Sequence, residues 1–140
     1  MTKFTKEEIS LCKQVAEKHR KDLKVGDWLL KDEEIGLVQD IKIDSVFNEW
    51  LITFLIESEE VLGSGCIRQN DPDIIPLWTI SDCLEFLREK KLRFTLYACE
   101  LNEYSMSIID DKNTIIVDTI GAKTPLEACL KAVLAVLEEE

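Results

Sequence analysis

The sequence predicts an α+β protein: an N-terminal helix and a three-stranded β-meander, followed by a two-layer unit of helix, three strands and helix. Apolar residues recur at helical spacing within 5–25, 79–91 and 124–137, and they alternate with polar residues in between. The chain has 140 residues, is 46% hydrophobic, and holds only five glycines and three prolines. This composition excludes a disordered chain and is sufficient for an ordinary core.

The first predicted element is a helix that begins after Thr5. Thr5 and Glu8 have the spacing of a capping box, in which each side chain bonds the backbone of the other residue. Gly26 is the expected end, because glycine readily adopts the left-handed conformation that terminates helices. The apolar stripe of this helix is Ile9, Cys12, Val15, Ala16 and Leu23. The last turns contain the basic residues Lys18, Arg20, Lys21 and Lys24. The helix dipole stabilises positive charge at this end of a helix.

Three strands are expected next, at residues 27–30, 35–43 and 50–56. Short polar turns separate them, so they form an antiparallel meander. The following segment, residues 57–73, contains two glycines, a proline and several charges, which are typical of a loop. The predicted organisation is therefore an N-terminal subdomain at 1–62, a linker at 63–74 and a second subdomain at 75–140.

The second subdomain begins with a helix capped by Thr79. Strands are expected at 94–99 and 104–108, because apolar and polar residues alternate there, and at 114–118, which follows the polar turn 110–113. The last helix opens with Thr124-Pro125-Leu126-Glu127, which combines an N-cap, a proline at the first helical position and a glutamate at the third. Two helices on one face of a three-stranded sheet bury both apolar stripes.

The charge distribution argues against a nucleic-acid-binding protein. The chain has 17 basic and 28 acidic residues and a net charge of −11. Residues 1–25 carry seven basic and four acidic residues, whereas residues 26–62 carry two and ten. An acidic chain is repelled by phosphates unless its basic residues are segregated. Of the segments 1–25, 26–62 and 63–140, the first, with the predicted helix, is the one with a net positive charge.

The sequence predicts a soluble cytoplasmic protein. No apolar run approaches the length of a membrane-spanning helix, and the first residues lack the apolar core of a signal peptide. The five cysteines are widely spaced, as expected of reduced thiols, and three of them fall at apolar helical positions. They are Cys12, Cys66, Cys83, Cys99 and Cys129.

No arrangement of nucleophilic, acidic or basic residues in the sequence predicts catalysis, and no cofactor is expected. The single histidine, His19, is the one base available to a Ser-His or Cys-His arrangement. Ser64 and Cys66 are candidate nucleophiles, but Gly63-Ser64-Gly65-Cys66 matches neither a nucleophile elbow nor a phosphate-binding loop. We expect a flexible turn and a surface histidine.

No resident metal is expected either. Zinc requires locally paired Cys or His ligands, which the chain lacks. Acidic residues cluster at 32–34, 71–73 and 110–111, where they are typical of solvated turns. Divalent-cation binding by these turns stays an open alternative.

The three tryptophans, Trp28, Trp50 and Trp78, allow two interpretations. Large aromatic residues pack cores and subdomain interfaces, and they also anchor recognition surfaces. Trp78 lies after the predicted linker and just before the next helix, and it is the best candidate for bridging the two halves.

Residues 75–140 resemble the phage α/β/α sandwich domain family of uncharacterised phage and prophage proteins. The similarity rests on Ile75-Pro76-Leu77-Trp78, on the strands around Tyr97 and Tyr104, and on residues 124–132. It implies an origin in a mobile element and no particular activity.

Three further resemblances concern smaller features. Residues 26–56, which open with Gly26-Asp27-Trp28, resemble small Src-homology or KOW-type β-barrels. The order of elements in 75–140 is that of double-stranded-RNA-binding domains. That family has lysines at the start of the last helix, where this chain has Pro125, Leu126 and Glu127, so the RNA-binding chemistry is missing. The strands before Gly121 and Thr124 also look like HicB-type antitoxins, without their Pro-Asp-rich segment.

These observations predict a phage-type accessory protein that acts by protein–protein interaction, without catalysis, and that self-associates, for example as a dimer. The candidate interaction surface comprises Trp28, Trp50, Trp78, Lys18, Arg20, Lys21 and Lys24. One alternative is a nucleic-acid-associated regulator or antitoxin-like protein that uses the basic helix. Another is an acidic segment, 26–62, that mimics nucleic acid and binds a basic enzyme. A third is an enzyme that uses Cys66 or Ser64 with His19.

Overall fold

The computed structural model describes residues 4–31, 34–44, 49–56, 64–68, 73–99 and 103–138. The chain divides into two compact units: unit 1 joins Met1–His19 to Trp78–Glu140, and unit 2 is Arg20–Leu77. Unit 2 is thus inserted into unit 1. This grouping differs from the predicted subdomains, because the N-terminal helix belongs with the C-terminal elements and not with the meander. Helix periodicity does not encode which distant element a helix packs against.

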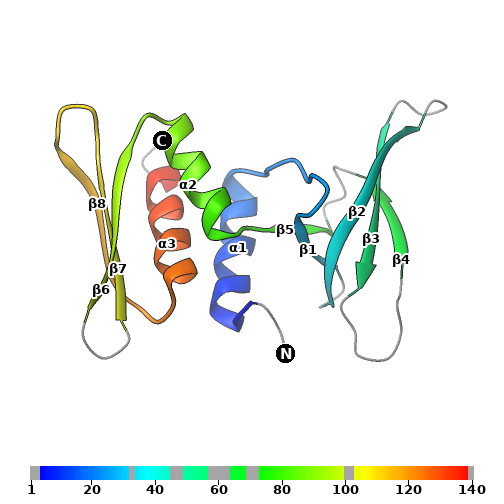
Figure 1. Cartoon of the computed structure of the whole chain (residues 1–140), viewed down its shortest axis with the longest axis horizontal. Coiled ribbons are helices and arrows are strands. Elements are labelled where there is room, and N and C mark those ends of the chain that lie inside the picture. Colours follow the sequence, from blue (N-terminus) through cyan, green and yellow to red (C-terminus); the bar gives the residue numbers. More distant parts are fainter. Residues whose placement is uncertain are drawn as a thin grey trace. The chain divides into compact units, whose positions relative to one another are not determined.

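Unit 2 contains an antiparallel sheet in the order β4-β3-β2-β1-β5 (Figure 1). Its strands are β1 (Trp28–Lys31), β2 (Glu34–Asp44), β3 (Glu49–Ile56), β4 (Ser64–Arg68) and β5 (Ile75–Leu77). The predicted meander β1–β3 is confirmed. The predicted linker is wrong in part, since it contains β4, which pairs with β3. β5 pairs with β1, and Pro76 is tolerated there because β5 is the last strand of the described sheet.

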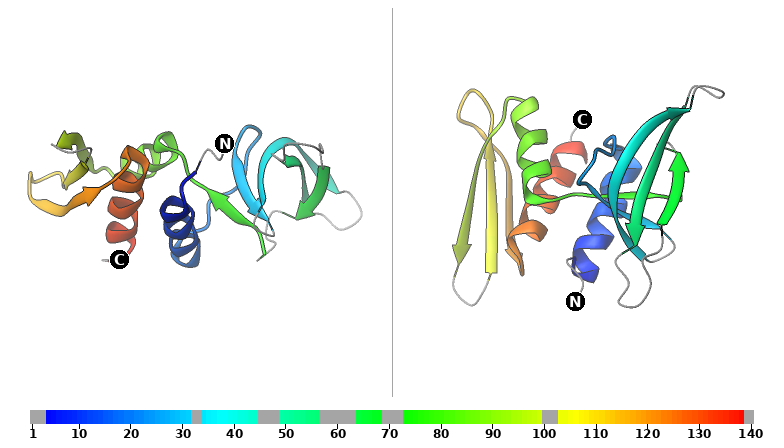
Figure 2. Two further views of the ribbon diagram at one scale, coloured as in Figure 1. Left: turned by 90° about the horizontal axis from the view of Figure 1, so that it is seen from below. Right: turned by 45° about the vertical axis from the view of Figure 1, so that its right-hand side comes forward.

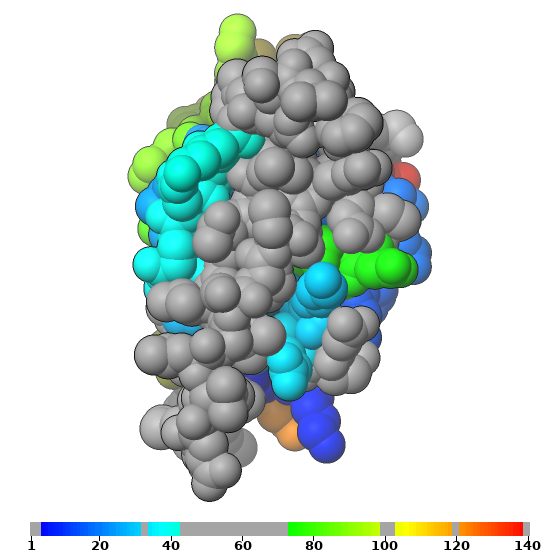
Figure 3. All heavy atoms as spheres, turned by 90° about the vertical axis from the view of Figure 1, so that its right-hand side faces the viewer, coloured from blue at the N-terminus to red at the C-terminus, as the bar shows by residue number. Residues whose placement is uncertain are grey.

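The core of unit 2 is formed by Leu23, Leu29, Val38 and Ile74, and Ile41 packs against it. Burying side chains of this size stabilises a fold by roughly 1.5–3 kcal/mol each. Glu34, Gln39, Asp40 and Lys42 of β2 are exposed, and β2 reaches the surface in Figure 3 (cyan). Asp40 and Lys42 form an exposed ion pair there, at 3.5 Å.

Helix α1 (Lys6–Lys18) begins as predicted and ends earlier than predicted. The capping box is present: Glu8 accepts from the Thr5 N–H at 2.8 Å, and Thr5 accepts from the Glu8 N–H at 3.1 Å. At His19 the backbone becomes extended, with φ −151° and ψ 114°. Leu23, expected on the helical stripe, lies instead in the core of unit 2. A competing tertiary contact therefore overrides the helical pattern beyond Lys18.

The remaining elements of unit 1 follow the predicted order helix, three strands, helix. They are α2 (Ile80–Glu89), β6 (Arg93–Cys99), β7 (Glu103–Ile109), β8 (Ile115–Ala122) and α3 (Pro125–Glu138). The strands form an antiparallel sheet in the order β6-β7-β8. Thr79 caps α2 in a second capping box with Asp82, as the sequence indicates for this N-terminus.

The helices α2 and α3 cover one face of the β6-β7-β8 sheet, which confirms the two-layer arrangement (Figures 1 and 2). Helix α1 packs against α3 as an addition to these layers. Contacts on several sides explain why nine of the 14 residues of α3 are buried. No helix in the described residues is long and apolar enough to cross a membrane.

Candidate functional site

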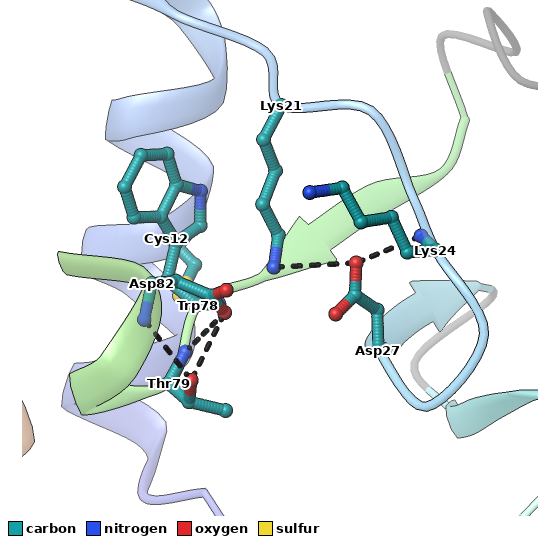
Figure 4. Close-up of polar contacts among 7 residues, drawn as sticks. All are labelled: Cys12, Lys21, Lys24, Asp27, Trp78, Thr79 and Asp82. Carbon is teal, nitrogen blue, oxygen red and sulfur yellow. Dashed lines mark hydrogen bonds and ion pairs between the residues drawn. The ribbon is translucent and has the colours of Figure 1, made fainter. Parts of the chain in front are cut away.

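An aromatic cluster lies where the chain leaves and re-enters unit 1. Trp78 is 2% exposed, and its ring meets that of Phe86 edge-on, with centroids 5.7 Å apart. The ring of His19 lies 5.2 Å from Phe86 and 6.0 Å from Trp78. The Trp78 N–H also donates to the Cys12 sulfur at 3.4 Å (Figure 4). Trp78 is therefore a core residue of unit 1 and offers no accessible recognition surface.

The other two tryptophans belong to unit 2. Trp28 is half-buried on β1 and pairs in register with Leu37 of β2. Trp50 stands opposite Ile43 of β2, and its side chain lies outside the described residues. Leu37 and Ile43 are six residues apart, which corresponds to roughly 20 Å along a strand. The three tryptophans expected to form one interaction surface are therefore divided between the units, and the two in unit 2 stand well apart.

The basic residues predicted on one helix are divided in the same way. Lys18 ends α1 in unit 1, whereas Arg20, Lys21 and Lys24 follow the helix and belong to unit 2. The Lys21 ammonium lies 3.8 Å from the Asp27 carboxylate, and its side chain is only 13% exposed. The predicted basic helical face does not form, because the helix ends at Lys18.

The Gly26-Asp27 pair organises the turn that enters β1 (Figure 4). The Asp27 carboxylate accepts from the Lys24 N–H at 2.8 Å. Gly26 has φ +92°, a conformation that side chains disfavour. Its N–H donates to the Val38 carbonyl, and the Val38 N–H donates to the Asp27 carbonyl. These contacts are structural and explain the residues of the motif without a ligand.

The candidate catalytic residues belong to different units. His19 is in unit 1, where it contacts Phe86 and Trp78. Ser64 and Cys66 lie on β4 in unit 2, and their side chains lie outside the described residues. Cys12, Cys83 and Cys129 are fully buried, one on each helix, and burial raises the pKa of Cys129 to about 11. A protonated, inaccessible thiol is a poor nucleophile.

The acidic turn at 110–111 is likewise structural. The Asp110 carboxylate accepts from the backbone N–H groups of Lys112 and Thr114, each at 2.9 Å. Asp32, Glu33, Asp71 and Pro72 lie outside the described residues. Among the described residues, no group of three His, Cys, Asp or Glu side chains is close enough to hold a metal ion.

The β6-β7-β8 sheet offers a more accessible surface, which no sequence pattern singles out. In the described part of unit 1, helices cover one face only (Figure 2). Tyr97 on β6 and Ile115 on β8 are 41% and 62% exposed. Register places Tyr97 opposite Ser105, and Ile115 opposite Ile109. Their register partners are four residues apart on β7, so Tyr97 and Ile115 are two separate exposed apolar side chains on this sheet.

Strand β6 is also an edge of this sheet, since β7 is its one strand partner in the described order. On its helix-facing side Phe94 and Leu96 are only half-buried. Their register partners Ile108 and Met106 on the central strand β7 are fully buried. The sequence does not reveal this difference in burial between β6 and β7. In both strands the apolar residues alternate with polar residues in the same way.

Comparisons with protein families, with curated protein sequences and with solved structures find no match to this chain.

Proposed function

We propose that the chain is a non-catalytic accessory protein of the phage or prophage type that binds another protein through the β6-β7-β8 sheet of unit 1. The observation that carries this proposal is the sheet face left uncovered in the described part of unit 1, with Tyr97 and Ile115 exposed. Edge strands and uncovered sheets are common sites of protein association. We also propose a cytoplasmic location, which the composition of the sequence favours.

Several features support protein binding over the alternatives. At the start of α3, where double-stranded-RNA-binding domains have lysines, Glu127 is buried and pairs with Lys131 at 3.1 Å. The basic residues expected to contact nucleic acid are divided between the two units. A net charge of −11 disfavours both nucleic acid and a second copy as the partner.

The first experiment is affinity capture of tagged full-length protein from its native lysate, with and without nuclease, followed by mass spectrometry. We expect a protein partner that survives nuclease. The variants Tyr97→Lys and Ile115→Lys should lose it, because a charge on the surface opposes burial. Val25→Lys is the matched control, since Val25 is 63% exposed on unit 2.

Three results would argue against the proposal. Loss of every partner on nuclease treatment favours the nucleic-acid-associated regulator. Loss of the partner in the Val25→Lys variant, with Tyr97→Lys and Ile115→Lys unaffected, places binding outside this sheet. Capture of the untagged chain alone favours self-association, which sedimentation of the purified protein would measure.

A further inference from the structure

We propose that the edge of β6, which has no strand partner on that side among the described residues, binds an extended, acidic segment of a partner protein as an additional antiparallel strand. This inference rests on the proposed function: one segment of the partner pairs with the β6 edge, while the rest of the partner covers the sheet face that carries Tyr97 and Ile115. Backbone N–H and C=O groups of alternate residues along an edge strand point away from the sheet and can pair with an incoming strand.

The two edges of this sheet differ in their suitability. β6 pairs with β7 in unbroken register from Arg93 to Cys99. β8 shows two register irregularities against β7, between Tyr104 and Met106 and between Ile108 and Ile109. Such irregularities protect natural edges from pairing. β6 contains no proline, and its one charged residue, Arg93, stands at its start. The regular edge is therefore β6.

Apolar side chains along β6 supply a second contribution. Phe94 and Leu96 are half-buried on the helix-facing side, and Tyr97 is exposed on the other. An added strand with apolar residues at alternate positions covers Phe94 and Leu96 in the same way that β7 covers its neighbours. Cross-strand pairs of this kind stabilise a sheet by about 0.2–1 kcal/mol each.

The charge around the start of β6 sets the chemistry of the partner. Residues 88–93 hold four basic residues and one acidic residue, in a chain of net charge −11. Arg88, Lys90, Lys91 and Arg93 are all exposed. The Arg88 guanidinium lies over the ring of Phe94 at 5.9 Å, next to the half-buried apolar residues. This local basic cluster is complementary in charge to carboxylates of a partner, and it would repel a basic segment.

Strand direction then places the carboxylates. In an antiparallel pair, the C-terminal end of the incoming strand lies beside the start of β6, where the basic cluster is. The partner segment is therefore apolar at alternate positions and acidic at its C-terminal end. Phosphates of a nucleic acid share the charge, but they cannot use the strand edge or the apolar residues, so an acidic polypeptide fits better.

The test uses the full-length protein and three labelled, N-acetylated peptides of alternating valine and threonine. The first ends in two glutamates, the second begins with them, and the third ends in two lysines. Fluorescence anisotropy measures binding, and amide hydrogen exchange by NMR locates it. We expect the first peptide to bind about tenfold more tightly than the others and to slow exchange at alternate amides of β6.

Matched variants test the role of charge. Lys90→Gln combined with Lys91→Asn should weaken binding of the first peptide about fivefold at low salt. Asparagine suits position 91, where φ is +60°. Lys6→Gln combined with Lys123→Gln removes the same charge from exposed positions elsewhere in unit 1 and should leave binding unchanged.

Four results would overturn the inference. They are equal binding of the three peptides, protection outside β6, binding of a single-stranded oligonucleotide in place of the peptide, and protection of β6 that rises with protein concentration alone. If lysate capture still yields a partner that depends on Tyr97, the proposed function stands and only this inference fails. If the first peptide binds β6 but no protein is captured, the proposed function is the part that fails.

Discussion

The Glu8 carboxylate accepts a hydrogen bond from the Thr124 hydroxyl at 2.6 Å, although the two residues are 116 positions apart. Glu8 also accepts from the Thr5 N–H and completes the capping box of α1. Thr124 in turn accepts from the Glu127 N–H at 3.0 Å at the start of α3. The two helix N-termini are therefore joined through one buried carboxylate and one hydroxyl.

Replacement of Glu8 should destabilise unit 1 substantially. Glu8→Ala removes two hydrogen bonds and leaves Thr124 without this acceptor, so we expect a loss of about 2–3 kcal/mol. Urea unfolding followed by circular dichroism measures it. Glu7→Ala is the control, because Glu7 is exposed one residue earlier and should cost less than about 0.5 kcal/mol. Equal losses for both variants would show that neither hydrogen bond of the Glu8 carboxylate contributes to stability.

The buried thiol of Cys129 should make stability depend on alkaline pH. Its pKa is raised from 9.0 to about 11 by burial, so between these values the unfolded chain releases a proton that the folded chain retains. This contribution to stability is complete below pH 9 and is lost as pH rises toward 11, with a slope of up to about 1.4 kcal/mol per pH unit.

The test compares urea unfolding of the wild type and Cys129→Ala between about pH 8.5 and pH 10.5, a range chosen around this window. Other groups titrate equally in both proteins, so their difference isolates the thiol. We expect the stability advantage of the wild type to shrink as pH rises. An advantage that is constant over this range would contradict the raised pKa.

Gly26 should tolerate side chains only at the expense of backbone strain. Its φ is +92°, and a Cβ placed there meets no atom within 4 Å. The effect of Gly26→Ala is therefore conformational and not steric, and we expect a loss of about 1 kcal/mol. Gly26→Asn should lose less, because asparagine tolerates positive φ better. A larger loss for asparagine than for alanine, measured by thermal unfolding, would contradict this explanation.

Trp78 should behave as a core residue. Trp78→Ala removes a buried ring that packs on Phe86, so we expect a loss of roughly 3–5 kcal/mol in urea unfolding. His19→Ala removes an exposed ring from the same cluster and should cost less than about 1 kcal/mol. Similar, small losses of stability in both variants would contradict a core role for Trp78 and would make it a candidate interaction residue again.

Much of the local structure was predictable from the sequence. Thr5, Thr79 and Thr124 mark the three helix starts, because a capping side chain acts within three residues of its own position. Alternation identified β2, β6 and β7, and short β-prone runs identified β1, β3 and β8. The candidate site was less predictable. Tyr97, Phe94 and Leu96 fit an ordinary strand pattern, and only the sheet order shows that they lie at an edge.

Local sequence was enough to specify the capped helices and the strand-forming segments. These depend on side chains and backbone groups that are close along the chain. Three other features depend on the folded chain. Helix α1 packs on α3, and Leu23 lies in the core of unit 2 and not on the predicted helix. Residues 64–68 form a strand by pairing with β3. Each of these depends on a partner distant in sequence, and the free energy of burial or pairing with that partner outweighs the local preference.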